Sequence, residues 1–134
     1  MLQGKTVLIV DDEPKNIFAL SAVLKADGIN CITAKNGIEG IANIKLHHEI
    51  DVVLMDIMMP IMDGYEAIKQ IRMDEKMTSI PIIALTANAM KGDMEKCLVA
   101  GASDYVSKPV DIEELKNKMI NLLTYRQSDS NGRL

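Results

Sequence analysis

The segment VLMDIMMPIMDGYE, residues 53–66, places an aspartate directly after a run of apolar residues. An apolar run without alternating polar residues is typical of a strand that is buried on both faces of a parallel sheet. We therefore predict a strand over residues 51–55. A buried strand does not need a charge at its end in order to fold. Asp56 is thus either a residue that merely ends the strand or a functional residue.

Strands and helices alternate along the rest of the chain. Pro14 suits the first turn of a helix, and Asp63 with Glu66 three residues later suits an N-terminal cap. The other predicted strands are 5–10, 30–34, 81–85 and 103–107. The predicted helices are the segment from Pro14 to just before Gly28, then 37–47, the segment from Asp63 that carries Ile68 and Ile71, 88–100 and 111–124. This alternation predicts an α/β fold, a parallel sheet with helices on both faces.

Length and composition favour a single globular domain. Of the 134 residues, 48% are hydrophobic and 25% charged, and with one Phe and no Trp the core must be aliphatic and rich in Met. We predict a domain over residues 1–124 and a polar, disordered tail over residues 125–134.

The same composition argues against several classes of partner. A net charge of −4 argues against direct binding to nucleic acid, and no apolar run approaches the roughly 20 residues of a membrane helix. Cys31 and Cys97 are too few and too far apart for a disulfide framework or a zinc site. The chain does not open with the basic-then-apolar pattern of a secretory signal, so we expect it in the cytoplasm.

Polar residues follow four of the predicted strands. Asp11 and Asp12 follow the first strand and Asp56 the third, while Thr86 follows the fourth and Lys108 the fifth. Because ligands of such sheets bind beyond the carboxyl ends of the strands, we expect these side chains to lie together. None of them is informative alone, but their joint placement at one edge predicts a functional site.

Four segments, in their order and spacing, resemble the receiver domain of two-component response regulators. They are VLIVDDEP (7–14), VLMDIMMPIMDGYE (53–66), IIALTANA (82–89) and GASDYVSKPV (101–110), and the resemblance runs from about Lys5 to Leu123. The amino-acid sequences of these segments are most similar to those of receivers attached to hybrid sensor histidine kinases. The resemblance implies a flavodoxin-like fold of five βα units with strand order 2-1-3-4-5, as in chemotaxis receivers.

Three carboxylates at one edge of a sheet repel one another. Two unit charges about 4 Å apart repel by roughly 4 kcal/mol at an effective dielectric constant near 20. Mg²⁺, which prefers oxygen ligands and keeps several waters, would offset this repulsion. We predict Asp12 and Asp56 as direct ligands and Asp11 as a ligand either directly or through water. The resemblance adds the backbone carbonyl of Met58.

The resemblance also implies roles in phosphoryl transfer. Asp56 would accept a phosphoryl group from a phosphohistidine of a histidine kinase or histidine phosphotransfer domain, and Lys108 would contact a phosphoryl oxygen. The Lys108–Pro109 bond would be cis. Thr86 and Tyr105 would then switch the surface that binds an output protein. A dimer formed on phosphorylation is left open, as is whether the chain stands alone or is cut from a hybrid histidine kinase.

Two further positions are expected to set the lifetime of the phosphoryl group. Met58 and Asn88 lie two residues beyond Asp56 and Thr86, where the family varies. An apolar Met beside an acyl phosphate should hinder an attacking water, so we predict slow self-dephosphorylation. Asn88 could equally be the cap of the fourth helix.

Other functions share part of this chemistry. A magnesium-dependent phosphatase with an aspartyl nucleophile would use Asp56, the metal and Lys108, but it normally has a second acid where this chain has Met58. An FMN-binding flavodoxin-like protein would need a phosphate loop rich in Gly and hydroxyls after the first strand, where this chain has DDEP (11–14). A degenerate receiver that only scaffolds its partners would lack some of the site residues, whereas this chain has all of them. We therefore expect a signalling receiver rather than a turnover enzyme.

Overall fold

The structure is a computed structural model, and it describes residues 2–87 and 90–130. Its strands all run parallel in the order β2-β1-β3-β4-β5, which confirms the predicted fold. Along the chain the elements are β1 (Thr6–Val10), α1 (Pro14–Ala26), β2 (Asn30–Ala34), α2 (Gly37–Leu46), β3 (Val52–Asp56), α3 (Gly64–Met73), β4 (Ile82–Thr86), α4 (Lys91–Ala100), β5 (Asp104–Ser107) and α5 (Ile112–Ser130).

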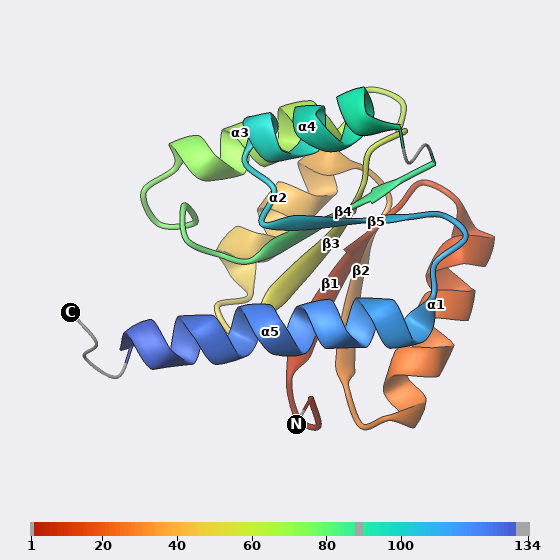
Figure 1. Cartoon of the computed structure of the whole chain (residues 1–134), viewed down its shortest axis with the longest axis vertical. Coiled ribbons are helices and arrows are strands. Elements are labelled where there is room, and N and C mark those ends of the chain that lie inside the picture. Colours follow the sequence, from red (N-terminus) through yellow and green to blue (C-terminus); the bar gives the residue numbers. More distant parts are fainter. Residues whose placement is uncertain (1, 88–89, 131–134) are drawn as a thin grey trace.

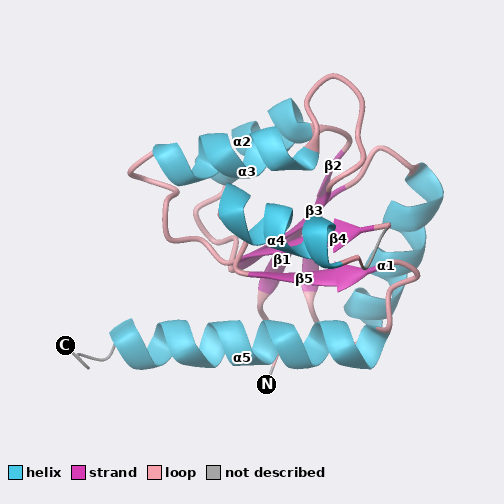
Figure 2. Cartoon of the chain, turned by 45° about the horizontal axis from the view of Figure 1, so that its top comes forward, coloured by secondary structure: helices cyan, strands magenta, loops and turns pink. Residues whose placement is uncertain are grey.

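The sheet is covered on both faces. Helices α2, α3 and α4 lie on one side, and α1 and α5 lie on the other (Figures 1 and 2). Each face has its own apolar cluster: Ile68 and Ile71 of α3 pack into the first, and Leu24 of α1 and Leu115 of α5 pack into the second. Neighbouring residues of β3 enter opposite clusters, Val53 the first and Leu54 the second. This double burial explains why the central strands are continuous apolar runs.

The start and end of several elements differ from the prediction. β3 spans Val52–Asp56, so Asp56 is its last residue, while Asp51 precedes it and accepts a hydrogen bond from the Thr6 amide at 2.8 Å. The predicted end of the last helix at residue 124 is too early, because α5 continues to Ser130. A helix extends at little cost once it is formed, and polar residues do not stop it. The proposed domain boundary after residue 124 stays a prediction.

The cap of α3 follows the prediction in part. Oδ1 of Asp63 accepts a hydrogen bond from the amide of Glu66 at 2.9 Å, as expected for an N-cap. The Glu66 carboxylate, however, accepts from the side chain of Gln70 at 3.2 Å. This cap begins α3 immediately after the loop that leaves Asp56.

Arg72, at the end of α3, joins three other segments. Its guanidinium donates to the carbonyls of Gly101 (2.7 Å), Thr78 (2.9 Å) and Ile80 (2.6 Å), and to the hydroxyl of Ser103 (3.2 Å). Burial lowers the pKa of this guanidinium. The C-terminal end of α4 and the segment before β5 are thereby held to the end of α3. These contacts lie near the amino ends of β4 and β5, whereas the acidic residues lie at the carboxyl ends of the strands.

None of the helices within residues 2–87 and 90–130 combines the length and the apolar composition that crossing a bilayer requires.

Candidate functional site

The register of the sheet brings the polar strand ends together. Val10 at the end of β1 pairs with Met55, so Asp11 and Asp56 both follow this pair. On the other side of β3, Asp56 pairs with Leu85, and Thr86 comes one residue later. The carboxyl ends of three adjacent parallel strands thus deliver these side chains to one edge, as the sequence predicts.

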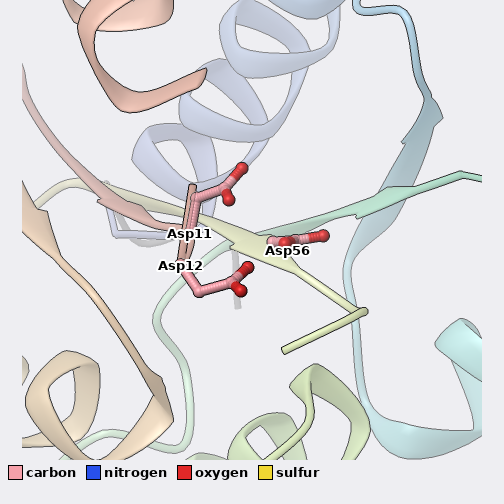
Figure 3. Close-up of side chains that lie close together, drawn as sticks. All are labelled: Asp11, Asp12 and Asp56. Carbon is pink, nitrogen blue, oxygen red and sulfur yellow. The ribbon is translucent and has the colours of Figure 1, made fainter. Parts of the chain in front are cut away.

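Three carboxylates form a cluster at this edge. Asp11 and Asp12 extend from the end of β1 and Asp56 from the end of β3 (Figure 3). One carboxylate oxygen from each lies within 4.8 Å of the others. Asp11 and Asp56 are buried and Asp12 is exposed. A cation that entered from solvent would therefore meet Asp12 first and the two buried acids behind it.

Lys108 neutralises part of this charge. Its ammonium donates to Oδ1 of Asp56 at 3.1 Å and to Oδ2 of Asp11 at 3.4 Å. Its backbone amide donates to the carbonyl of Thr86 at 2.7 Å, which ties the segment after β5 to the end of β4. The Lys108–Pro109 peptide bond is cis, as the resemblance implies.

Burial and charge shift the pKa values of this pair. Burial raises the pKa of the Asp56 carboxyl to about 6, against the opposing hydrogen bond from Lys108 and with the support of the negative charge of Asp11. Burial by itself lowers the pKa of the Lys108 ammonium, but its hydrogen bond to Asp56 and the charges of Asp56 and Asp11 outweigh burial and raise it. The site is therefore short of positive charge, and a bound cation would favour the ionised form of Asp56.

The loop between β3 and α3 is fixed directly to Asp56. The Met58 amide donates to Oδ1 of Asp56 at 3.3 Å, and the Gly64 amide donates to the carbonyl of Ile57 at 2.9 Å. A Cβ at Gly64 would lie 2.5 Å from the carbonyl oxygen of Asp56. Only glycine therefore allows α3 to begin so close to the end of β3.

Thr86 and Tyr105 lie on neighbouring strands. Thr86 is buried and pairs with Ser107 of β5, two residues beyond Tyr105, whose side chain is half-buried. Lys118 of α5 donates to the Tyr105 carbonyl at 2.6 Å, and its ammonium lies 4.9 Å from the centre of the Tyr105 ring. The tyrosine is thus connected both to the strand next to the acidic cluster and to α5.

Sequence reasoning missed two contacts at this site. The Asn16 side chain donates to Oδ2 of Asp11 at 3.4 Å, and Lys118 holds Tyr105 as described. The pattern of α1 could have placed Asn16 near the acids, because it lies in the first turn after them. Nothing in the local sequence distinguishes Lys118, which is half-buried in the structure, from the other lysines of the chain. Asn88, the second predicted lifetime residue, lies outside the described residues.

Comparison with known proteins shows the family. The response regulator receiver domain family matches residues 7–120. The polar-differentiation response regulator DivK of Brucella abortus (strain S19) is 38% identical over 108 residues, which cover 81% of this chain and 87% of DivK. Histidine kinase 3 of Arabidopsis thaliana is 36% identical over 135 residues, which cover 86% of this chain but only 13% of the kinase.

Two solved structures are similar over nearly the whole chain. The receiver domain of sensor histidine kinase PA1611 from Pseudomonas aeruginosa PAO1, with a magnesium ion coordinated in its active site cleft, has a TM-score of 0.83 and 37% identity and covers 90% of this chain and 98% of its own. The receiver domain of Saccharomyces cerevisiae Ssk1, in complex with the histidine phosphotransfer protein Ypd1, has a TM-score of 0.86 and 32% identity, with 94% and 93% covered.

The chain belongs to the response regulator receiver domain family and is a receiver domain of two-component signalling. Such receivers are signalling domains rather than turnover enzymes. The residues at its acidic edge suit a divalent cation, because three carboxylates lie within reach of one ion and a single ammonium does not balance them.

Proposed function

We propose that this receiver accepts a phosphoryl group from a phosphohistidine donor on Asp56, with Mg²⁺ at the acidic cluster, and that Thr86 and Tyr105 convert this event into altered protein binding. The observation that carries the proposal is the contact of Lys108 with both Asp56 and Asp11 at the end of three adjacent strands. An ammonium and two buried acids in contact are expensive to bury, and a phosphoryl-transfer site accounts for them.

In the proposed reaction the Asp56 carboxylate is the nucleophile. One of its oxygens forms a bond to the phosphorus while the bond from phosphorus to the imidazole nitrogen breaks, and the electron pair stays with the imidazole. Lys108 is placed to meet the negative charge on the transferred oxygens. In the metal-free site burial raises the pKa of Asp56 to about 6, so a bound cation that favours the ionised carboxylate would also favour Asp56 as the nucleophile.

We infer that Asp11, Asp12 and Asp56, with the backbone carbonyl of Met58, would hold the Mg²⁺. The ion would supply positive charge that stabilises the negative charge on the phosphoryl oxygens during transfer. With it, three carboxylates and one ammonium are neutral together, so the added phosphate leaves little net charge in the site. The magnesium ion in the PA1611 receiver supports this assignment, since that domain is 37% identical to this chain.

We propose the exposed side of α1 as the docking surface of the donor, which would be a histidine kinase or a histidine phosphotransfer domain. Phe18, the single Phe of the chain, lies near Pro14 and is 64% exposed. Such exposure is unusual for a phenylalanine. On the other side of α1, a pocket of ≈ 350 Å³ has mostly apolar walls and ends at Asp11 and Lys108. The complex of Ypd1 with the Ssk1 receiver supports a histidine phosphotransfer protein as the donor.

Phosphorylation would shift the population of two receiver states. A phosphoryl group can favour one state only through contacts that it makes better there. Thr86, which follows the Asp56–Leu85 pair, would offer such a contact. Tyr105 and Lys118 would transmit the change to α5, and the output would be a protein contact or a dimer. Replacing Thr86 by Ala should leave phosphorylation intact but remove its effect on hydrogen exchange over residues 104–107, compared by mass spectrometry with and without phosphate.

The direct test uses acetyl phosphate and intact mass. Wild type with Mg²⁺ should gain the mass of one phosphoryl group, whereas Asp56→Asn, or wild type in EDTA, should not. Glu75→Gln, which changes an exposed acid away from the cluster, should behave as wild type. Phosphorylation of Asp56→Asn to the wild-type extent would reject Asp56 as the acceptor. Size-exclusion chromatography of the same samples reports on dimerisation.

An aspartyl-nucleophile phosphatase would use the same acids and lysine. It is disfavoured because Met58, whose amide contacts Asp56, stands where such enzymes need a second acid. Release of phosphate from p-nitrophenyl phosphate over many turnovers would overturn the signalling proposal.

We further propose a cytoplasmic location for the protein. The two free thiols of Cys31 and Cys97 agree with a reducing compartment.

A further inference from the structure

A small cavity lies at the amino ends of the strands, at the opposite edge of the sheet from the acidic cluster. Its volume is ≈ 90 Å³, and its lining comes from the end of α2 with the turn before β3 and from the turn between α3 and β4. The polar residues of the lining are His47, His48, Lys76 and Ser79, and the other lining residues are apolar and buried. We call this cavity the basic pocket. It contains both histidines of the chain.

Most hydrogen-bond donors of the basic pocket have no partner in the protein. In the part of the chain that the structure describes, the Lys76 ammonium and the His48 ring make no hydrogen bond or ion pair, and neither do the hydroxyl and the backbone amide of Ser79. The ring of His47 contacts Glu49 through Nδ1 at 3.4 Å, which leaves its Nε2 available. The pocket thus offers unpaired donors from two separate turns.

Backbone acceptors of the same two turns are already occupied. The carbonyls of Thr78 and Ile80 accept hydrogen bonds from the Arg72 guanidinium at 2.9 and 2.6 Å. The His47 carbonyl accepts from the amide of Ile50 at 3.3 Å. These bonds hold both turns in place, so the donors of the pocket are positioned before a ligand arrives.

The charge of the basic pocket favours an anion. No acid is among its lining residues, and Glu49 beside His47 is the one carboxylate that contacts their side chains within the described residues. A metal ion does not account for the pocket. Among the residues that the structure describes, only the acidic cluster brings three metal-ligand atoms within 4.8 Å of one another. An ammonium and unpaired backbone amides are donors to anions and not ligands of metals.

The size of the cavity limits the ligand. A water molecule takes about 30 Å³ of the liquid, so ≈ 90 Å³ holds about three waters or one ion of about five heavy atoms. A tetrahedral oxyanion directs its oxygens in four directions, which suits donors that come from two turns. A carboxylate presents two oxygens in one plane and would leave some of these donors unused.

We propose that the basic pocket binds a tetrahedral oxyanion with two negative charges, which is either a free inorganic ion or the phosphate group of a small metabolite. Lys76 and the two imidazoles supply the opposing charge, and Ser79 donates hydrogen bonds. The bound ion joins the turn after α2 to the turn before β4. This site goes beyond the proposed function, because Asp56 lies at the other end of β3, about 13 Å along the strand from Val52.

The test follows the backbone amides of His48 and Ser79 and the two imidazoles by NMR, in metal-free buffer at constant ionic strength. The probes are sodium sulfate, inorganic phosphate and glycerol 3-phosphate, each compared with sodium chloride. His48→Ala and Lys76→Ala each remove one exposed donor side chain. Lys35→Ala is the matched control, since it removes an exposed lysine that follows the carboxyl end of β2.

Sulfate and phosphate should shift these signals in a saturable way, with a dissociation constant of about 10 mM or lower, and chloride should not. His48→Ala and Lys76→Ala should each weaken binding about five-fold or more, whereas Lys35→Ala should bind as the wild type does. Tighter binding of glycerol 3-phosphate than of inorganic phosphate would identify a metabolite as the source of the ligand. The reverse order would identify the free ion.

The pH dependence of sulfate binding gives a second readout. Sulfate keeps both charges between about pH 6.5 and pH 8, while imidazoles gain positive charge as the pH falls through this range. The ionisable groups at the pocket are the two imidazoles and Lys76, with Glu49 beside His47. Carboxylates and ammonium groups ordinarily keep their charge in this range. Sulfate should therefore bind about three-fold more tightly at pH 6.5 than at pH 8, and His48→Ala should reduce this difference.

Shifts that rise without saturation up to about 50 mM sulfate would overturn the inference. Wild-type affinity in both His48→Ala and Lys76→Ala would overturn it too, as would equal affinity at the two pH values. Thermal unfolding in chloride at the wild-type midpoint shows that both variants fold. These measurements involve no phosphoryl transfer, so their failure leaves the proposed function intact. Sulfate binding by Asp56→Asn with wild-type affinity would separate the basic pocket from the phosphoacceptor site.

Discussion

The ammonium of Lys108 lies 3.1 Å from Oδ1 of Asp56, although 52 positions separate the two residues in the chain. The end of β3 and the segment after β5 are joined at this contact, with β4 between them in the sheet. The Lys108 ammonium also contacts Asp11, so a single cation meets two acids of the three-carboxylate cluster. This imbalance has consequences for stability that can be measured without any partner protein.

The raised pKa of Asp56 predicts that the apo-protein loses stability as pH increases from about 4 to about 6. In this range the unfolded chain, with a carboxyl pKa of 3.8, has released its proton, while the folded protein still holds it. The penalty is absent below pH 4 and complete above pH 6, where it amounts to up to about 3 kcal/mol.

Asp56→Asn removes this penalty. In EDTA at pH 7 its free energy of unfolding should exceed that of the wild type by up to about 3 kcal/mol, and the difference should vanish toward pH 4. Urea unfolding at several pH values measures both proteins. A difference between them that stays constant from pH 4 to pH 7 would show that Asp56 is not the responsible group.

Magnesium should reverse this effect. An ion that binds only the folded protein at ten times its dissociation constant stabilises it by about 1.4 kcal/mol. We expect MgCl₂ to raise the thermal midpoint of the wild type and of Glu75→Gln, but to raise that of Asp12→Asn much less. Differential scanning fluorimetry over a magnesium titration makes the comparison. A full shift in Asp12→Asn would exclude this exposed acid as a ligand.

Met58 should protect the acyl phosphate from water. Its amide contacts Asp56 and its side chain stands in solvent beside the site. We expect Met58→Asn to speed loss of the phosphoryl group about tenfold, which corresponds to about 1.4 kcal/mol of barrier. Decay is followed by intact mass after the donor is removed. Met73→Asn, which changes a Met that is 83% exposed at the end of α3, serves as the control and should decay as wild type does. Equal decay in all three proteins would assign no protective role to Met58.

Gly101 should resist substitution far more than Gly92. Gly101 ends α4 with φ of 119°, and a Cβ there would lie 2.6 Å from Cγ of Arg72. Gly101→Ala should therefore lower the free energy of unfolding by about 2 kcal/mol or more. A Cβ at Gly92 meets nothing within 4 Å, so Gly92→Ala in α4 should be neutral or raise it by about 0.5 kcal/mol. Urea unfolding of both variants decides, and similar losses in both would contradict the role of the contact with Arg72.

The sequence by itself determined the succession of strands and helices and the edge at which the polar residues meet. Residues such as Val53 and Leu54 are buried on opposite faces, so the strand appears as an unbroken apolar run. Strand ends in a parallel sheet share one edge, which is why Asp11, Asp56 and Thr86 could be placed together in advance. The strand order and the cis bond before Pro109 came from resemblance to a family rather than from the pattern.

Only the tertiary structure decided which distant residues touch and which backbone angles they adopt. The contacts of Arg72 with Gly101 and of Lys118 with Tyr105, and the backbone φ of 71° at Ile61, have no signature in a local pattern. Periodicity reports whether a position is buried, because burial repeats with each turn or pleat. Periodicity does not identify which distant residue a side chain contacts, because such a contact forms only once the helices have packed on the sheet.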